Sequence, residues 1–198
     1  MLTVNQLALT HRKDLTVLVD SLSFTLNDGE RLALIGEEGN GKSTLLHLIR
    51  NTLEKRSDLR VFYMPQDAGD LLDFSLSPVE LFSPSGKKEE RSRAGILLGS
   101  MKFTADEMNH PSAGLSGGQK AKLMFLMMAE SGANVLLLDE PTRNLSPLSG
   151  PVIRELLAEY PGCIITVSHD RRLIQEVCTR TVTLTPEGVR PSSFCDNF

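Results

Sequence analysis

The sequence predicts an α/β domain in which helices cover both faces of a mostly parallel central sheet. Two segments, 135–138 and 163–167, are almost wholly apolar and have the length of buried strands. Continuous apolar strands that alternate with helices are typical of a parallel sheet with both faces covered. The segments that show helical spacing of apolar residues are 43–50, 118–131, 148–160 and 171–179.

The N-terminal part of the chain has a different pattern. Apolar residues alternate over 2–9 and 15–26, which predicts two strands that form a separate antiparallel layer. The turn at 27–29 (Asn-Asp-Gly) has the composition of a hairpin, so we expect it to pair the second strand with a third at 31–35. A further short strand is expected at 60–64.

Residues 67–117 interrupt this alternation of strands and helices. They contain prolines, glycines, a charged run at 87–91 and amphipathic helical stretches, which predicts a small helical subdomain. We interpret the charged run as a solvated helix end. With residues 186–198 expected to form a C-terminal tail, the whole chain (1–198) is predicted to be one domain.

Composition excludes several classes of protein. Of the 198 residues, 40% are hydrophobic and 23% are charged, as in ordinary soluble domains. The net charge of −4 argues against general nucleic-acid binding. No apolar run reaches the ~18 residues of a membrane helix, and no signal peptide is expected, so the predicted location is cytoplasmic, with no direct membrane insertion. Cys163, Cys178 and Cys195 fit no zinc pattern and are expected to be reduced thiols.

The first motif that carries chemistry is a glycine-rich loop that opens a predicted helix directly after a predicted strand. In such a loop, backbone N–H groups and the helix N-terminus surround phosphate oxygens. Lys42 is expected to reach the β- and γ-phosphates, and the hydroxyl of Ser43 is expected to ligate Mg²⁺. The predicted ATP-binding residues here are Gly36, Glu37, Glu38, Gly39, Asn40, Gly41, Lys42, Ser43 and Thr44.

Two further motifs point to the same chemistry. The apolar strand at 135–138 ends in Asp139 and Glu140, at the sheet edge where such folds bind ligands. Asp139 suits the shell of Mg²⁺, and Glu140 suits a general base for an attacking water. The second motif places a serine hydroxyl and two glycines before a helix, which makes another anion-binding surface. It is formed by Leu115, Ser116, Gly117, Gly118 and Gln119.

Because one ATP does not need two phosphate-binding helix ends from one chain, we expect the second surface to meet a nucleotide held by another copy. In this order, with Ser168-His169-Asp170 downstream, the motifs resemble those of the ATP-binding cassette ATPases over residues 2–185. The resemblance implies a P-loop NTPase cassette that dimerises around ATP. It also implies a Mg²⁺-sensing glutamine at Gln66, a γ-phosphate-contacting histidine at His169, and adenine stacking at His11.

Within this superfamily the chain most resembles the F subfamily, and there the second of two cassettes. This resemblance rests on the segments 140–145 (Glu-Pro-Thr-Arg-Asn-Leu), 160–162 and 168–171, and on the short insertion around 93–98. Members of that subfamily lack membrane domains, and many act on the ribosome. Here only one cassette is present and the linker between cassettes is absent. Residues 143–146 read Arg-Asn-Leu-Ser where the family typically has Asn-His-Leu-Asp. Ser146 thus replaces a carboxylate that acts across the dimer interface, which leaves its effect on communication between the ATP sites open.

Three functions follow from this reading. The leading one is Mg²⁺-dependent ATP hydrolysis by a soluble F-like ATPase that dimerises, with itself or with another cassette, and has the ribosome as a candidate partner. The single cassette is also compatible with the ATP-binding subunit of a transporter whose membrane part is a separate chain. The altered segment 143–146 favours a third reading, a nucleotide-dependent switch with low turnover.

Overall fold

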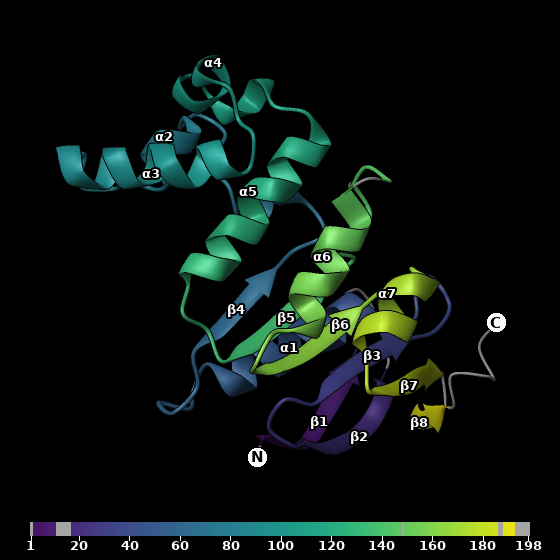
Figure 1. Cartoon of the computed structure of the whole chain (residues 1–198). Coiled ribbons are helices and arrows are strands. Elements are labelled where there is room, and N and C mark those ends of the chain that lie inside the picture. The colour runs from purple at the N-terminus through teal and green to yellow at the C-terminus, as the bar shows by residue number, and fades with distance from the viewer. Residues whose placement is uncertain (1, 11–16, 148, 186–187, 193–198) are drawn as a thin grey trace. The chain divides into compact units, whose positions relative to one another are not determined.

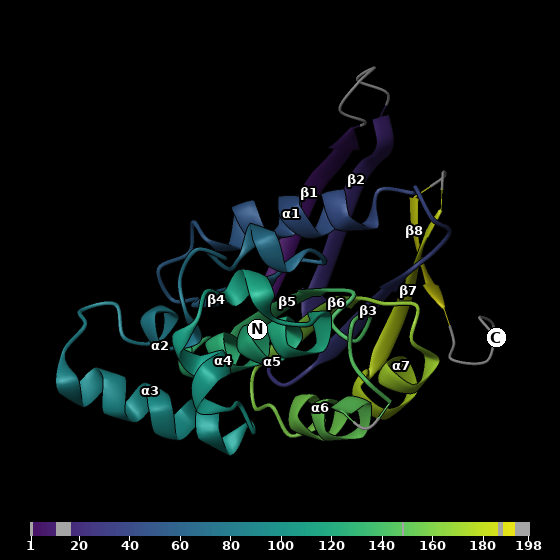
Figure 2. The same ribbon diagram turned by 90° about the horizontal axis from the view of Figure 1, so that it is seen from above.

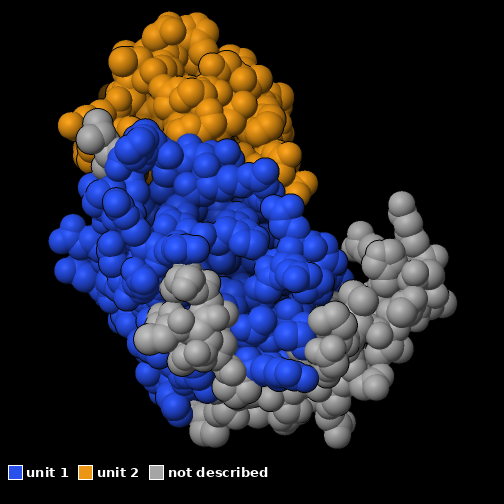
Figure 3. Space-filling view, turned by 90° about the vertical axis from the view of Figure 1, so that its right-hand side faces the viewer, with its two compact units in different colours: residues 1–66, 132–198 blue, residues 67–131 orange. Residues whose placement is uncertain are grey.

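A computed structural model gives the fold and describes residues 2–10, 17–147, 149–185 and 188–192. The chain divides into two compact units, which Figure 3 colours separately. Unit 1 comprises residues 1–66 and 132–198, and unit 2 comprises residues 67–131. Unit 2 is therefore an insertion in the sequence of unit 1.

Unit 1 contains two sheets (Figure 1). β1 (Leu2–Thr10) pairs antiparallel with β2 (Val17–Leu26) in a separate two-stranded sheet. The larger sheet has the strand order β4-β5-β6-β3-β7-β8, and all its pairs are parallel except β7 with β8. Its strands are β3 (Arg31–Ile35), β4 (Val61–Met64), β5 (Val135–Asp139), β6 (Cys163–Val167), β7 (Arg180–Thr185) and β8 (Gly188–Ser192).

Helices cover both faces of the larger sheet. Figure 2 shows α1 on one side of the sheet and α6 and α7 on the other. Successive side chains of a strand point to opposite faces. Leu32 and Leu34 of β3 therefore share a buried cluster with α1, whereas Ala33 between them packs with Ile174 of α7. The helices are α1 (Lys42–Leu53), α6 (Ser149–Ala158) and α7 (Arg171–Val177).

Unit 2 is helical, and several of its helices begin at capping boxes. In a capping box the N-cap side chain accepts from the N3 amide, and the N3 side chain accepts from the N-cap amide. The pairs are Ser77 with Glu80, Thr104 with Glu107, and Ser116 with Gln119. The helices are η1 (Ala68–Asp70), α2 (Pro78–Leu81), α3 (Lys88–Ser100), α4 (Ala105–Asn109), η2 (Ser112–Gly114) and α5 (Gly117–Glu130).

The parallel sheet and the separate antiparallel layer match the sequence prediction, but one predicted pairing is wrong. The turn at 27–29 does not make a hairpin, because β2 and β3 belong to different sheets. β3 pairs instead with β6 and β7. Leu32, Ala33 and Leu34 are buried. Because helices cover both faces of a central strand, this position buries all three side chains.

The structure also contains two strands that the sequence analysis does not place. β7 is a strand that the sequence analysis does not predict, because threonines alternate with its apolar residues. β8 occupies residues 188–192 of the expected tail, because its backbone pairs with β7. Residues 193–198 lie outside the described part. The helical unit comprises Asp67–Ser131, and α5 packs against η1 within it.

The cysteine prediction holds where the structure describes it. Cys163 and Cys178 are buried free thiols, and burial raises the pKa of Cys178 to about 12. Cys195 lies outside the described residues. Across the described ranges, no helix has both the length and the apolar character needed to cross a bilayer.

We expect Gly162→Ala to destabilise the fold by roughly 1–3 kcal/mol. An added Cβ would meet the backbone carbonyl of Asn134 and would lie 2.7 Å from the Tyr160 ring. Gly95→Ala is the matched control, because nothing lies within 4 Å of its added Cβ and alanine favours the helix α3. Urea unfolding measures both, and equal stabilities of the two variants would contradict the packing argument.

Candidate nucleotide-binding site

The glycine-rich loop lies between β3 and α1, as the motif requires. Gly41 is the N-cap of α1 and has a left-handed backbone (φ 82°), which glycine adopts without strain. Gly36 (φ 144°) also needs the absence of a side chain, since an added Cβ would lie 2.6 Å from the carbonyl oxygen of Leu184 in β7. The loop therefore packs closely against β7. Helix α1 begins at Lys42, directly after Gly41.

Lys42 is buried and closes the loop on itself. Its ammonium group donates to the carbonyl oxygens of Gly36 (2.8 Å) and Glu37 (2.6 Å). Desolvation by burial lowers the pKa of Lys42, and the nearby carboxylates of Glu140, Glu38 and Asp139 oppose that shift. A cation held at the base of a loop of backbone N–H groups is poised for phosphate oxygens.

Asp139 ends β5 and is almost fully buried (3% exposed). Burial raises the pKa of its carboxyl group, and a hydrogen bond from Ser43 partly opposes this. Its Oδ1 atom has no hydrogen-bond partner within the described part of the chain. A buried carboxylate oxygen without a partner, beside a serine hydroxyl, has the donor chemistry that Mg²⁺ takes from proteins.

Glu140 follows Asp139 on a strained backbone (φ 50°), while its amide donates to the carbonyl of Val167 (2.9 Å). The side chain turns toward His169. The amide of His169 donates to Glu140 Oε2 (3.3 Å), and the imidazole Nε2 lies 3.6 Å from Oε1. Burial raises the pKa of Glu140 more than this hydrogen bond and the nearby positive charges lower it. A carboxylate with a raised pKa suits proton transfer near neutral pH.

One cavity of about 510 Å³ in unit 1 collects the expected catalytic and metal-binding side chains. It is lined by Glu38, Gly39, Lys42, Ser43, Gln66, Asp139, Glu140, Arg143, Val167 and His169. A neighbouring cavity of about 710 Å³ shares His169 and takes in Gly36, Glu37 and Asn40. Gly41 and Thr44 line neither cavity. His11 lies outside the described residues.

Besides Val167, Arg143 is the member of this set that the sequence analysis does not assign to the site. Its amide donates to the carbonyl of Glu140 (3.1 Å), so it stands on the turn that follows the acid pair. That three-residue spacing in a turn is the sequence signal that could have placed it in the site.

In unit 2, the segment 115–119 joins a buried leucine to the start of α5. Leu115 is 8% exposed, and Ser116 is the N-cap of the helix. Gln119 Oε1 accepts from both the amide and the hydroxyl of Ser116, each at 2.9 Å. The glycines Gly117 and Gly118 form the first helical turn, so their amides remain available as donors at the helix N-terminus.

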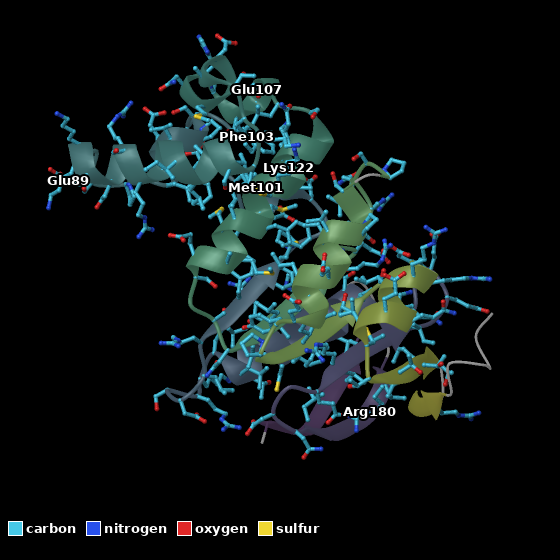
Figure 4. The ribbon with its side chains drawn as sticks, in the orientation of Figure 1. Glu89, Met101, Phe103, Glu107, Lys122 and Arg180 are labelled. Atoms are coloured by element: carbon cyan, nitrogen blue, oxygen red, sulfur yellow. The ribbon has the colours of Figure 1, made fainter. Side chains whose placement is uncertain are left out.

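Glu107 is a second residue that sequence reasoning misses. Its Oε1 accepts from the side-chain amide of Gln119 (2.5 Å), and its Oε2 accepts from the amide of Thr104 (2.7 Å). The Thr104 amide is the largest cause that lowers the pKa of Glu107. Glu107 and Lys122 both lie near the start of α5 in Figure 4, and Lys122 donates to the carbonyl of Met101 (3.3 Å). Glu107 thus connects the start of α4 to the start of α5.

Comparison with known proteins identifies the class to which this fold and cavity belong. Residues 19–143 match the ABC transporter family, which covers more than half of the chain. The chain therefore belongs to the ABC transporter family of ATP-binding cassettes. The fold agrees, since the dimeric cassette MJ0796, solved in a post-hydrolysis state with ADP and Pi, has a TM-score of 0.76 at 20% identity, over 98% of this chain and 99% of that one.

The chain is also similar in sequence to proteins of the F subfamily. ABC transporter F family member 2 of Arabidopsis thaliana is 32% identical over 87% of this chain, and member 4 is 38% identical over 81%. YdiF of Bacillus subtilis is 35% identical over 96%. The chain spans 27%, 24% and 30% of these proteins, respectively. The resemblance to F-subfamily cassettes seen in the sequence is confirmed.

We expect Glu107→Ala to lower the stability of unit 2, because it removes a helix cap and leaves the Gln119 amide without its acceptor. Glu89→Ala is the matched control, since Glu89 lies in the first turn of α3 and is exposed (Figure 4). Thermal unfolding of both variants is the measurement. A Glu89 variant as unstable as the Glu107 variant would contradict this role.

Proposed function

We propose that the chain binds ATP and hydrolyses it with Mg²⁺ as a cytoplasmic, dimer-forming cassette of the F type. The observation that carries the proposal is the single cavity lined by Lys42, Ser43, Gln66, Asp139, Glu140 and His169. Phosphoryl transfer depends mainly on positioning and on charge stabilisation, and these side chains supply both.

ATP binding begins with the loop. Its amides and the N-terminus of α1 receive the phosphates, and Lys42 exchanges the carbonyls of Gly36 and Glu37 for β- and γ-phosphate oxygens. A lysine that is already desolvated gives up little hydration in this exchange. The triphosphate also balances the positive charge that burial disfavours.

Magnesium fits the same cavity. Mg²⁺ is usually held by one or two protein oxygens together with phosphates and water, so it does not need a cluster of several acidic side chains. Within the described ranges there is no group of three or more His, Cys, Asp or Glu side chains that could hold a metal ion. Ser43, Asp139 and Gln66 are the residues that would hold it, and the ion supplies charge neutralisation on the phosphates.

Glu140 acts as the general base. The water oxygen forms a bond to the γ-phosphorus, and the bond to the β–γ bridging oxygen breaks with its electron pair passing to ADP. The proton of the water goes to Glu140, whose pKa is raised by burial. His169, which already contacts Glu140, orients this carboxylate and donates toward the γ-phosphate.

A second cassette completes the site. Segment 115–119 offers helix N-terminal amides that one bound ATP does not require from its own chain. The dimeric state of the cassette MJ0796 supports this partner. Of the two roles that the sequence resemblance leaves open, we propose the ribosome-associated one over that of a transporter subunit with a separate membrane chain, because the chain is similar to F-family proteins.

We expect Glu140→Gln to reduce turnover by about 100-fold or more, because the general base is lost. ATP binding persists, and the variant accumulates as an ATP-bound dimer. Phosphate release and size-exclusion chromatography measure these effects, with Glu155→Gln on the exposed side of α6 as the matched control. Undiminished phosphate release by the Glu140 variant would remove the role given to Glu140.

Lys42→Ala is expected to weaken the binding of both ATP and ADP, because both nucleotides place phosphates in the loop. Calorimetry measures the two affinities, and Lys55→Ala, an exposed lysine just past the end of α1, is the control. Unchanged affinities in the Lys42 variant would count against the loop as the phosphate site.

The dependence of phosphate release on protein concentration distinguishes a dimeric ATPase from a low-turnover switch. If two chains form each site, phosphate release per chain increases steeply with protein concentration. A rate that stays near zero at every concentration would favour the switch.

A further inference from the structure

Arg143 lines the cavity of the proposed ATP site although the family motif does not call for a cation there. It belongs to the segment 143–146, which departs from the pattern of the F subfamily. The inference below rests on the proposed function, because it concerns the ligand of that same cavity.

The loop that carries Arg143 is fixed at both ends. At its start, the amide of Glu140 donates to Val167 of β6 (2.9 Å). At its end, the carbonyl and hydroxyl oxygens of Ser146 accept from the amide of Ser149 at 2.9 and 3.3 Å, which anchors the loop to the first turn of α6. Turn hydrogen bonds from Arg143 to Glu140 and from Leu145 to Thr142 (both 3.1 Å) hold the middle. Arg143 is thus carried on a short loop with a defined path.

The charged groups around the cavity favour a second cation beside a bound triphosphate. The cavity walls bear the carboxyl groups of Glu38, Asp139 and Glu140. Lys42, which stands against them, is bound to loop carbonyls at the base. A bound triphosphate adds several negative charges, about half of them on the terminal phosphate. One buried ammonium group and one divalent cation leave the outer oxygens of that phosphate near the carboxylates of the wall.

The guanidinium group of Arg143 is available for this task. Among the described residues it forms no ion pair and no side-chain hydrogen bond, and the side chain is exposed at the cavity wall. A guanidinium group presents planar, paired donors that match two phosphate oxygens at once, and it stays charged at any working pH.

We infer that Arg143 binds the γ-phosphate of ATP held in its own chain. Lys42 then holds the inner side of the β- and γ-phosphates, and Arg143 holds the outer side of the terminal phosphate. Because ADP lacks that phosphate, Arg143 is a residue that discriminates ATP from ADP. Its charge also stabilises the transferring phosphoryl group, as arginine side chains do in other phosphoryl-transfer sites.

The same loop could instead present Arg143 to the nucleotide of a second chain. The observations favour the chain's own nucleotide, because Arg143 lines the cavity that contains its own Lys42, Asp139 and Glu140. The turn that begins at Glu140 also places Arg143 close to the base along the chain.

The test is calorimetric binding of two probes, the non-hydrolysable imido analogue of ATP and ADP, each with Mg²⁺. It uses Arg143→Ala, Arg143→Lys and a matched control, Arg172→Ala. Arg172 is exposed in the first turn of α7 and lines neither cavity, so its removal changes the net charge equally. Protein is kept dilute enough to stay monomeric, as checked by light scattering.

With Arg143→Ala, the affinity for the ATP analogue falls about 10-fold or more, since charged hydrogen bonds to a phosphate are lost. ADP affinity stays within about two-fold, and lysine restores part of the loss. The control behaves as the unmodified protein. Equal losses for both probes or no loss for the analogue would each overturn the inference. Failure of the unmodified chain to bind either probe would instead overturn the proposed function.

Discussion

Parallel pairing of three neighbouring strands is the constraint on which the site depends. Asp139 at the end of β5 is in register with Val167 of β6, and Val167 is followed at once by the loop that contains His169. Leu34 of β3 is also in register with Val167, two residues before the phosphate-binding loop begins. Because the carboxyl ends of parallel strands meet at one edge, phosphate loop, acid pair and histidine converge without any long excursion of the chain.

This convergence works against the stability of the isolated cassette. Lys42 and Asp139 are buried, ionisable side chains. Burial lowers the pKa of Lys42 and raises the pKa of Asp139, and both shifts favour the neutral form of the side chain. Oδ1 of Asp139 lacks a hydrogen-bond partner within the described ranges. Glu140 adds a backbone conformation that non-glycine residues rarely adopt. In the function proposed above, bound nucleotide and metal would relieve these costs together, which would couple ligand binding to folding stability in this unit.

Most of the site follows from the sequence because its residues act through local geometry. A glycine-rich loop before a helix, or an acid pair after a buried strand, defines its own surroundings. Glu107 could not be found this way, since its contact with Gln119 depends on how two helices pack. Arg143 was not assigned to the site because segment 143–146 differs from the family pattern, so no motif gave this residue a role. The same limit explains β3, whose partners β6 and β7 are remote in sequence, whereas the nearby turn at 27–29 suggested a hairpin.

Ser146 contributes to the fold of its own chain through its contacts at the start of α6. Its hydroxyl group accepts from the amide of Ser149 and lies 2.9 Å from the Ser149 hydroxyl, so it serves the start of α6 within its own chain. Aspartate is as good as serine in that capping role. An aspartate at position 146 would therefore leave the start of α6 capped. Under the dimer proposed above, the choice between serine and aspartate at this position is set by the partner chain and not by the fold of the chain that carries it.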